Sequence, residues 1–289
     1  MPQLIVNADD FGLTAGVNRA IIELHAAEVL TSATLMAQAA ATEQAVEMGL
    51  AMPTLGVGCH VVLVDGAPVM EAPEVRTLVN RETRSFYPTI GSFLKRLFTG
   101  RIRPKEIEAE VAAQIALLQS YGLRLTHVDT HKHTHMFPAV LRPVLRAARK
   151  AGIVAVRNPF EPVWSVNATA NAPDVRRLQV ILLRRLEPSF RRIVAEEGFT
   201  TTDGAIGVLA TGTIDIATVK SMLLAMPEGT FELVSHPGYR DADLERANTR
   251  LLSSRELERN ALMAIRDFRG VDLVSFADLN PTGQATSKD

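Results

Sequence analysis

Four of the seven histidines lie within nine residues, and Asp129 lies among them. The four are His127, His131, His133 and His135. If a strand runs through this segment, residues 127, 129 and 131 share one face, because successive side chains of a strand point to opposite faces. Imidazoles beside a carboxylate are the groups from which divalent metal sites and acid–base sites are built. A surface cluster with no chemical role is the alternative interpretation.

Other apolar runs in the chain also end in acids, histidines or arginine. They supply Asp9 and Asp10 after Leu4–Val6, His60 at the end of 57–60, Asp129 and His131 after 125–128, Arg157 after 153–156, and His236 after 231–235. In a parallel α/β barrel the C-terminal ends of the strands gather on one face, where catalytic residues lie. We therefore expect these side chains to converge on a single cleft.

Each of these side chains suits a different chemical task. Asp9 and Asp10 are adjacent and point in different directions, so one can ligate a metal while the other accepts a proton. Two neutral imidazoles, His60 and His131, together with one Asp form a site that leaves coordination positions open for water and substrate. His236, on a Pro-Gly turn, is a candidate general acid.

Four further residues are candidates for supporting roles. Asp129 is expected to fix the tautomer of a histidine. Arg157 is expected to neutralise a carboxylate or to bind substrate, and a purely structural ion pair is an equal alternative. His127 and His133 are expected to surround the site or to form a polar rim.

Strand-like runs separated by helical patterns of 10–18 residues predict βα units and a parallel sheet. The predicted strands lie near 4–6, 33–36, 55–63, 125–129, 153–157, 231–235 and 271–275, and the predicted helices near 15–28, 42–51, 104–121, 138–151, 174–187, 214–225 and 254–267. No feature marks a domain boundary, so we predict an α/β fold with one TIM-like (β/α) barrel domain over 1–280 and a disordered tail over 281–289. A doubly wound open sheet is the competing architecture.

Composition restricts the class of protein. The chain has 289 residues, 47% hydrophobic and 22% charged, with a formal net charge of −1, which gives no bias toward nucleic acid. Cys59 is the single cysteine, so a metal must be held by histidines and carboxylates. Neither a signal peptide nor a run of about 20 apolar residues is found, which predicts a cytoplasmic protein.

Arginines occur in pairs along the predicted helix near 174–187 and just after it. They are Arg176, Arg177, Arg184, Arg185, Arg191 and Arg192, around Leu178, Ile181, Leu182 and Leu186. A solvated face of an amphipathic helix is the ordinary interpretation. Weak contact with a membrane surface is the alternative if the substrate carries a lipid.

Four motifs together resemble the YdjC-like carbohydrate deacetylases. They are Asn-Ala-Asp-Asp-Phe-Gly-Leu at 7–13, Val-Gly-Cys-His-Val-Val-Leu at 57–63, Thr-His-Val-Asp-Thr-His-Lys-His-Thr-His-Met-Phe-Pro at 126–138 and Ser-His-Pro-Gly at 235–238. They occur in the family's order over nearly the whole chain. The resemblance implies a distorted (β/α) barrel that removes N-acetyl groups from sugars containing N-acetylglucosamine. The segments 63–69 and 156–162 are more similar to the hopanoid-biosynthesis-associated deacetylases than to the chitooligosaccharide branch.

The resemblance also implies roles for residues and a cofactor. Asp10, His60 and His131 are then the ligands of one divalent metal ion, Asp9 the general base and His236 the acid that protonates the departing amine. Imidazole ligands favour zinc, although the family is often described with magnesium. The sequence departs from the pattern at Cys59, where a larger hydrophobic residue is expected.

Other functional classes are weighed against this one. The partner implied is a carbohydrate or glycolipid, and a homodimer is implied only by the resemblance. A phosphoesterase would favour clustered basic residues at the strand ends, where only Arg157 is found. A sugar-binding protein without catalysis would need neither Asp9 nor Asp10. An iron oxygenase fits the ligands alone but not the βα alternation.

Overall fold

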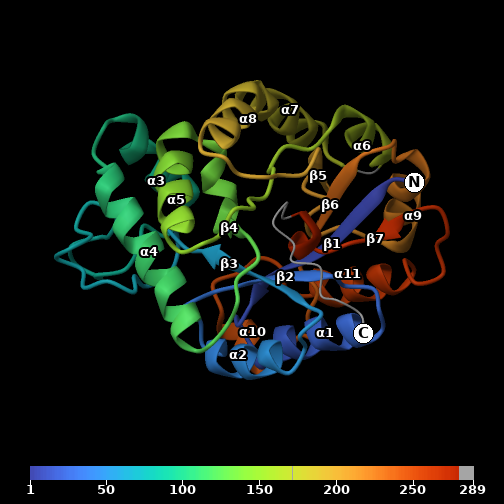
Figure 1. The fold of residues 1–289 in the computed structure, drawn as a ribbon, viewed down its shortest axis with the longest axis horizontal. Coiled ribbons are helices and arrows are strands. Elements are labelled where there is room, and N and C mark those ends of the chain that lie inside the picture. The colour runs from blue at the N-terminus through green and yellow to red at the C-terminus, as the bar shows by residue number, and fades with distance from the viewer. Residues whose placement is uncertain (171, 280–289) are drawn as a thin grey trace, which may run out of the picture.

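Short β-prone runs, most of them followed by a helix, form one parallel sheet in the computed structural model, which describes residues 1–170 and 172–279 (Figure 1). The strands are β1 (Gln3–Phe11), β2 (Ser32–Leu35), β3 (Gly56–Val61), β4 (Val128–Thr130), β5 (Gly204–Ile206), β6 (Thr230–Ser235) and β7 (Asp272–Leu273). The helices are α1 (Ala15–Ala26), α2 (Thr42–Leu50), α3 (Ile90–Phe98), α4 (Pro104–Ser120), α5 (Pro138–Lys150), α6 (Val163–Ala168), α7 (Asp174–Leu183), α8 (Glu187–Glu196), α9 (Ile216–Ala225), α10 (Ala242–Arg246) and α11 (Ser254–Met263).

The strand order distinguishes a barrel-like sheet from a doubly wound one. The order is β4-β3-β2-β1-β6-β5, and β7 also pairs with the start of β1. Strands β1 to β4 are neighbours in sequence order, and the second full neighbour of β1 is the late strand β6. A doubly wound sheet instead reverses its strand order partway, so that the first strand lies beside a strand from the middle of the chain. The sheet therefore curls as the wall of a barrel does.

Between β4 and β5 the wall is joined by single bridges instead of a regular ladder. Val156 bridges to Val128 of β4, and Ala155 bridges to Thr200, which precedes β5. The strand predicted over 153–157 is therefore wrong as a regular strand, because its backbone makes only these isolated pairings. The prediction of a distorted α/β barrel holds as a curled parallel sheet, and the regular strands of the described chain do not complete a TIM barrel.

Helices cover the outside of the curled sheet (Figure 1). Helix α5 shows why: Val140, Leu141, Val144 and Leu145 are fully buried, and their spacing of three and four residues places them on one side of a helix. Pro138 begins this helix, where the missing N–H has no partner to lose. The buried apolar residues of helices and strands join in a main hydrophobic core that spans the described residues.

Two predictions of local structure are corrected. The helix predicted to end at Pro188 ends at Leu183, and after a 3-10 turn α8 begins at Glu187, with Pro188 in its first turn. Proline in a first helical turn favours the start of a helix instead of ending one. The stretch 158–173, predicted to be irregular, contains α6. The predicted boundary at 280 and the tail over 281–289 lie outside the described residues, and no described helix is long and apolar enough to cross a membrane.

Candidate active site

The two adjacent carboxylates lie within β1, which continues to Phe11, beyond the predicted end at Val6. The pairing of β1 with β2 shifts register between Ala8 and Phe11, and Asp10 has a φ of 63°. This is the left-handed region, which Asp tolerates better than most residues. The irregularity turns Asp9 and Asp10 toward different partners, as predicted.

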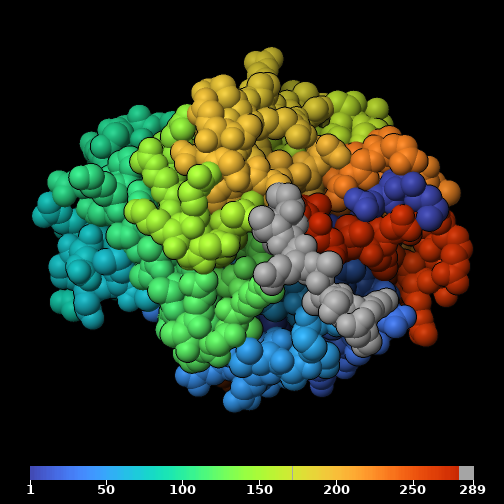
Figure 2. Space-filling model, viewed as in Figure 1, coloured from blue at the N-terminus to red at the C-terminus, as the bar shows by residue number. Residues whose placement is uncertain are grey.

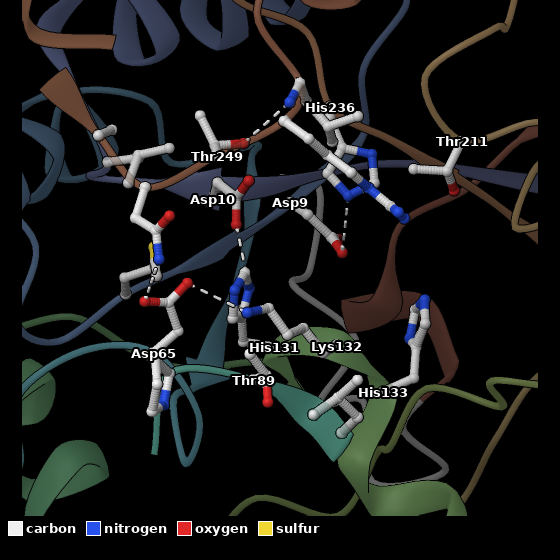
Figure 3. A pocket seen from close by; sticks show the side chains of 18 of the residues that line it. Asp9, Asp10, Asp65, Thr89, His131, Lys132, His133, Thr211, His236 and Thr249 are labelled. Carbon is white, nitrogen blue, oxygen red and sulfur yellow. Dashed lines mark hydrogen bonds and ion pairs between the residues drawn. The ribbon is translucent and has the colours of Figure 1, made fainter. Parts of the chain in front are cut away.

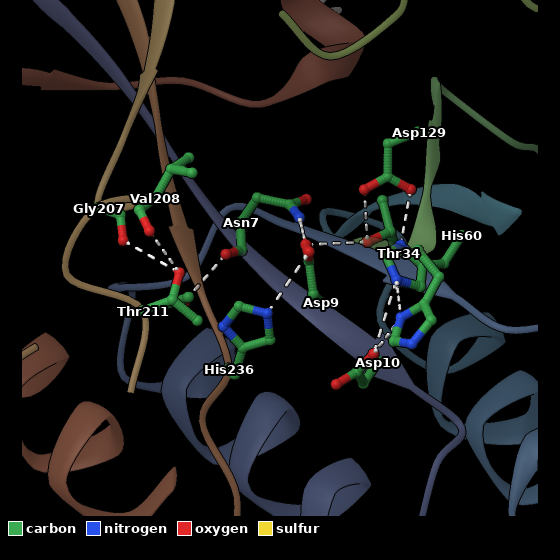
Figure 4. A network of polar contacts seen from close by, with 12 residues as sticks. Asn7, Asp9, Asp10, Thr34, His60, Asp129, Gly207, Val208, Thr211 and His236 are labelled. Atoms are coloured by element: carbon green, nitrogen blue, oxygen red, sulfur yellow. Dashed lines mark hydrogen bonds and ion pairs between the residues drawn. The ribbon is translucent and has the colours of Figure 1, made fainter. Parts of the chain in front are cut away.

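Asp10, His60 and His131 meet at one point, although they come from three parts of the chain. Figure 3 shows Asp10 with His131, and Figure 4 shows Asp10 with His60. His60 Nε2 lies 3.2 Å from His131 Nδ1, and Asp10 Oδ1 lies 3.6 Å from the first and 3.5 Å from the second. A tetrahedral site with bonds of about 2.1 Å separates its ligand atoms by about 3.4 Å. The three donors therefore fit one divalent ion.

The surroundings of these donors support the same interpretation. Asp129 Oδ1 lies 2.8 Å from His60 Nδ1, which directs the other ring nitrogen of His60 toward Asp10 and His131. Asp10 Oδ1 is buried and has no hydrogen-bond partner among the residues that the structure describes. A buried carboxylate oxygen without a partner is costly, and a cation would compensate it.

His131 does not lie on the predicted strand. β4 ends at Thr130, and His131 begins a 3-10 turn in which Lys132 and His133 both have positive φ. This turn is what brings the ring of His131 beside His60, with the two ring planes at 77°. The alternating spacing thus singled out a residue of the candidate donor set, but the strand on which that reasoning relied ends one residue before it.

Arg157 is completely buried and pairs with carboxylates from three strands. Its Nη atoms donate to Asp9 at 2.6 and 2.9 Å, its Nε donates to Glu232 Oε1 at 2.8 Å, and it also forms an ion pair with Asp129. The hydroxyl of Thr34 lies 3.3 Å from Asp9 and 3.4 Å from Asp129. Arg157 therefore neutralises carboxylates, one of the two roles predicted for it.

These contacts set the charges of the site. Burial raises the pKa of Asp9, but Arg157, His60 and His236 together hold it well below its usual range. Burial lowers the pKa of His60, but Asp129, Asp9 and Asp10 raise it to about 9. Without a metal ion, His60 therefore carries a proton at neutral pH.

A second possible group of metal donors consists of Asp9, His60 and Asp129. Arg157 already pairs with both carboxylates of this group. A guanidinium in that position supplies the positive charge that a metal would bring, so the set built on Asp10 is the better candidate.

His236 follows β6 and lies between two carboxylates. Its Nε2 is 3.8 Å from Asp9 Oδ2, and its Nδ1 is 3.7 Å from Glu258 Oε2. The backbone N–H of His236 also donates to Glu258 at 2.6 Å. Burial lowers the pKa of His236, but Glu258, with Asp9 and Asp10, raises it above its usual value. The imidazole is thus disposed to hold a proton.

Helix α11 contributes two buried charged residues that sequence reasoning missed. Arg255 donates to Asp10 Oδ2 at 2.6 Å, and Glu258, three residues later, bonds the backbone of His236 and of Gly212. Both side chains are fully buried. Their spacing of three residues was a usable signal, because it places them on one side of the predicted helix. Glu232, a lone carboxylate in an apolar strand, was also missed, and its burial required a partner.

The remaining histidines of the cluster are not among the three candidate metal donors. His127 is fully buried and stacks on Phe276 with 3.8 Å between ring centroids. His133 lines the pocket at the site, and burial lowers its pKa to about 3. His135 is buried between Thr130 and the carbonyl of Arg157. His127 and His135 thus contact buried residues of the protein interior and do not line the pocket.

A pocket of about 590 Å³ opens onto the site (Figure 3). Asp9, Asp10, His131 and His236 line its floor together with loop residues from 65–90 and 247–251. Lys132 on its rim pairs with Asp65 at 3.1 Å. Of the strand-end residues predicted to converge on one cleft, Asp9, Asp10, His131 and His236 line this pocket. His60, Asp129 and Arg157 are buried and do not line it.

The protein is an α/β protein with a curled parallel sheet. It carries a cluster of two histidines and one carboxylate at the C-terminal ends of its strands. Within that class, the chain belongs to the YdjC family, because the model of the YdjC-like proteins matches residues 3–266. The resemblance noted from the four motifs is therefore confirmed at the level of the family.

Relatives and a solved structure agree with this assignment. The chain is 43% identical over 158 residues to a carbohydrate deacetylase of Brevibacillus brevis, and the aligned region covers 55% of this chain and 60% of that protein. It is 28% identical over 265 residues to a carbohydrate deacetylase of Thermoanaerobacter pseudethanolicus, covering 91% of each. A crystal structure from Enterococcus faecalis V583, provisionally described as a cellobiose-phosphate cleavage protein, matches with a TM-score of 0.75 and 25% identity over 96% of this chain and 98% of the other.

Proposed function

We propose that this protein is a metal-dependent carbohydrate deacetylase that hydrolyses the acetamide of sugars or glycolipids containing N-acetylglucosamine. The observation that carries the proposal is the meeting of three possible metal donors, Asp10, His60 and His131, next to a pocket that Asp9 and His236 also line. Two relatives bear the name carbohydrate deacetylase, which supports the choice of reaction. Assignment to the hopanoid-associated branch stays a prediction.

Asp10, His60 and His131 would hold the ion. When bound, a divalent ion polarises a carbonyl oxygen and lowers the pKa of a water molecule. The donor set of two imidazoles and one carboxylate favours zinc or another late first-row ion over magnesium.

Asp9 and His236 divide the proton transfers on either side of the scissile bond. Asp9 keeps its negative charge because Arg157 pairs with it, so it is always available to accept the proton of the attacking water. Its low pKa also makes it a weak base, which suits only a water whose own pKa is lowered. His236, whose proton is stabilised by Glu258, donates to the departing amine nitrogen.

The proposal is tested by measuring acetate release from a panel of N-acetylglucosamine oligosaccharides and conjugates, together with the metal content of the protein. We expect acetate and a stoichiometric amine from at least one substrate, and a loss of both bound metal and activity in His131→Ala. Metal-loaded protein that releases no acetate from any member would refute the proposal.

A phosphoesterase is the rival that the same assay addresses. That hypothesis depended on Arg157 as the basic group at the strand ends, and its charge is already matched by three buried carboxylates. Phosphate monoesters of the same sugars serve as the comparison, and phosphate release without acetate release would favour the rival.

A further inference from the structure

Helix α7 exposes four large apolar side chains and buries none of its own residues. Val175, Leu178, Ile181 and Leu182 are 70%, 66%, 51% and 53% exposed. Their spacing places them on one side of the helix, which we call the apolar face of α7. α7 lies beside α8 at the periphery of the molecule, and Figure 2 shows these segments at the upper edge of the surface. Contiguous exposed apolar groups of this kind mark interaction sites.

The opposite side of the same helix faces the pocket of the candidate active site. Arg176, Val180 and Leu183 are half-buried on that side, and Leu183 packs against the core. Arg176 lines the pocket and donates to the carbonyl of Thr211 at 2.9 Å. The apolar face is thus separated from the pocket by the width of one helix, about 10 Å.

The segment that carries this face has a net positive charge, although the whole chain has a net charge of −1. Residues 174–192 contain six arginines and two carboxylates, Asp174 and Glu187, and Glu196 and Glu197 follow a few residues later. Arg184 and Arg191 share Glu187 at 3.3 and 2.9 Å. Arg185 is exposed, and no carboxylate of the described residues lies within 4 Å of it. Arg176 and Arg177 donate to backbone carbonyls, and Arg192 pairs with Glu196. The segment thus keeps a net positive charge, with Arg185 as its exposed arginine outside these pairs.

We propose that the apolar face of α7 docks the protein on an anionic lipid bilayer. An amphipathic helix binds such a surface by placing apolar side chains among the headgroups while arginines approach the lipid phosphates. The excess of arginine disfavours a second copy as the occupant, because pairing two such segments would bring like charges together. Docking would place the pocket next to the headgroups, which, on the proposed function, suits an N-acetylated sugar carried by a lipid.

The test is co-sedimentation of the full chain with phosphatidylcholine vesicles, with and without phosphatidylglycerol. We expect binding to the anionic vesicles that weakens as salt is raised. The double variant Leu178→Glu/Ile181→Glu should reduce binding at least about tenfold, and Arg185→Gln about fivefold. Leu224→Glu is the matched control, since Leu224 is 78% exposed on α9, and it should bind as the unmodified chain does.

Absence of binding to anionic vesicles, or an equal loss in Leu224→Glu, would overturn the docking proposal. A dimer seen by light scattering would also overturn it if the double variant abolishes that dimer and the protein does not bind vesicles. The apolar face would then join two copies of the chain. Circular dichroism verifies that each variant is folded. Vesicle binding requires no catalysis, and acetate release from a water-soluble sugar requires no vesicles, so each proposal can fail without the other.

Discussion

At the scale of single residues, the site is a set of buried charges that balance one another. Arg157 balances Asp9, Asp129 and Glu232, and Arg255 balances one oxygen of Asp10. Burial raises the pKa of Glu232 to about 7, so three carboxylates around one guanidinium are not all held fully ionised. The other oxygen of Asp10 lacks a partner, and it is the one that faces the two imidazoles. Without a metal ion the proton of His60 supplies positive charge beside this oxygen, and a divalent ion would take the place of that proton.

The role of Asp9 can be tested by Asp9→Asn, which keeps the shape of the side chain and removes its basicity. We expect turnover to fall at least about a hundredfold, because a positioned base contributes that much. Bound metal should be retained, since the ligand set does not include Asp9. Acetate release and metal analysis of the same sample provide the measurement. Asp267→Asn, at an exposed position, is the control, and normal activity in Asp9→Asn would rule out a proton-accepting role.

At the scale of elements, the strands deliver the donors and helix α11 supports them from outside the sheet. One side of α11 bears Arg255 toward Asp10 and Glu258 toward His236. The proposed metal ligand Asp10 and the proposed general acid His236 thus both depend on the position of one helix. These contacts explain why Arg255 and Glu258 are fully buried although they are charged residues of a helix rich in polar residues.

Glu258→Gln tests whether α11 tunes the acid. Glu258 raises the pKa of His236, and a general acid acts only when it is protonated, so activity falls as pH rises through that pKa. Removing the carboxylate should move this alkaline limb of kcat/KM to lower pH by about one unit. A variant that lowers kcat/KM equally at every pH would show that Glu258 has only a structural role.

Gly58 of β3 packs against the ring of His127, and a substitution at Gly58 tests how tight this packing is. A Cβ at position 58 would lie 2.5 Å from His127 Cε1, so Gly58→Ala must displace a buried ring. We expect a loss of about 1–3 kcal/mol in the free energy of unfolding, measured by denaturant titration. The loss should disappear in a His127→Ala background, as a double-mutant cycle would show. Gly91→Ala is the control, because the nearest atom there is 4.0 Å away, and an equal loss at both glycines would contradict the explanation.

At the scale of the whole molecule, the ion would connect segments far apart in the chain. Its three ligands come from β1, β3 and the turn after β4, while His236 follows β6. The wall of the curled sheet is joined by isolated bridges near residues 155 and 200. Binding at this site should therefore stabilise the fold as a unit.

Metal binding should raise the thermal midpoint of unfolding, and chelation should lower it. A free metal concentration of one hundred times Kd adds about 2.7 kcal/mol. The pKa of His60 is about 9 without metal, and a ligand must lose its proton, so metal affinity and the shift in Tm should increase from pH 6 to pH 9. Thermal scans with and without a chelator provide the test. An equal shift in His131→Ala would show that the metal binds elsewhere.

The sequence alone predicted the candidate donors and an α/β fold with a parallel sheet. Asp10, His60, His131, Asp9 and His236 each follow or end an apolar run, and the alternation of strands and helices brings such residues to one edge of a parallel sheet. The residue types and their local periodicity, which the sequence contains directly, were enough to single out these residues, whereas the division of roles among them came from the family resemblance.

Only the tertiary structure decided which buried charges compensate one another. Arg255 and Asp10 are 245 residues apart, and Arg157 and Glu232 are 75 apart, so no local pattern links them. The same holds for His127, which shares the alternating pattern of its neighbours but packs on Phe276. Side-chain periodicity assigns a residue to a face, whereas its depth and its partner depend on strand register and on the helices packed outside, which are properties of the folded chain.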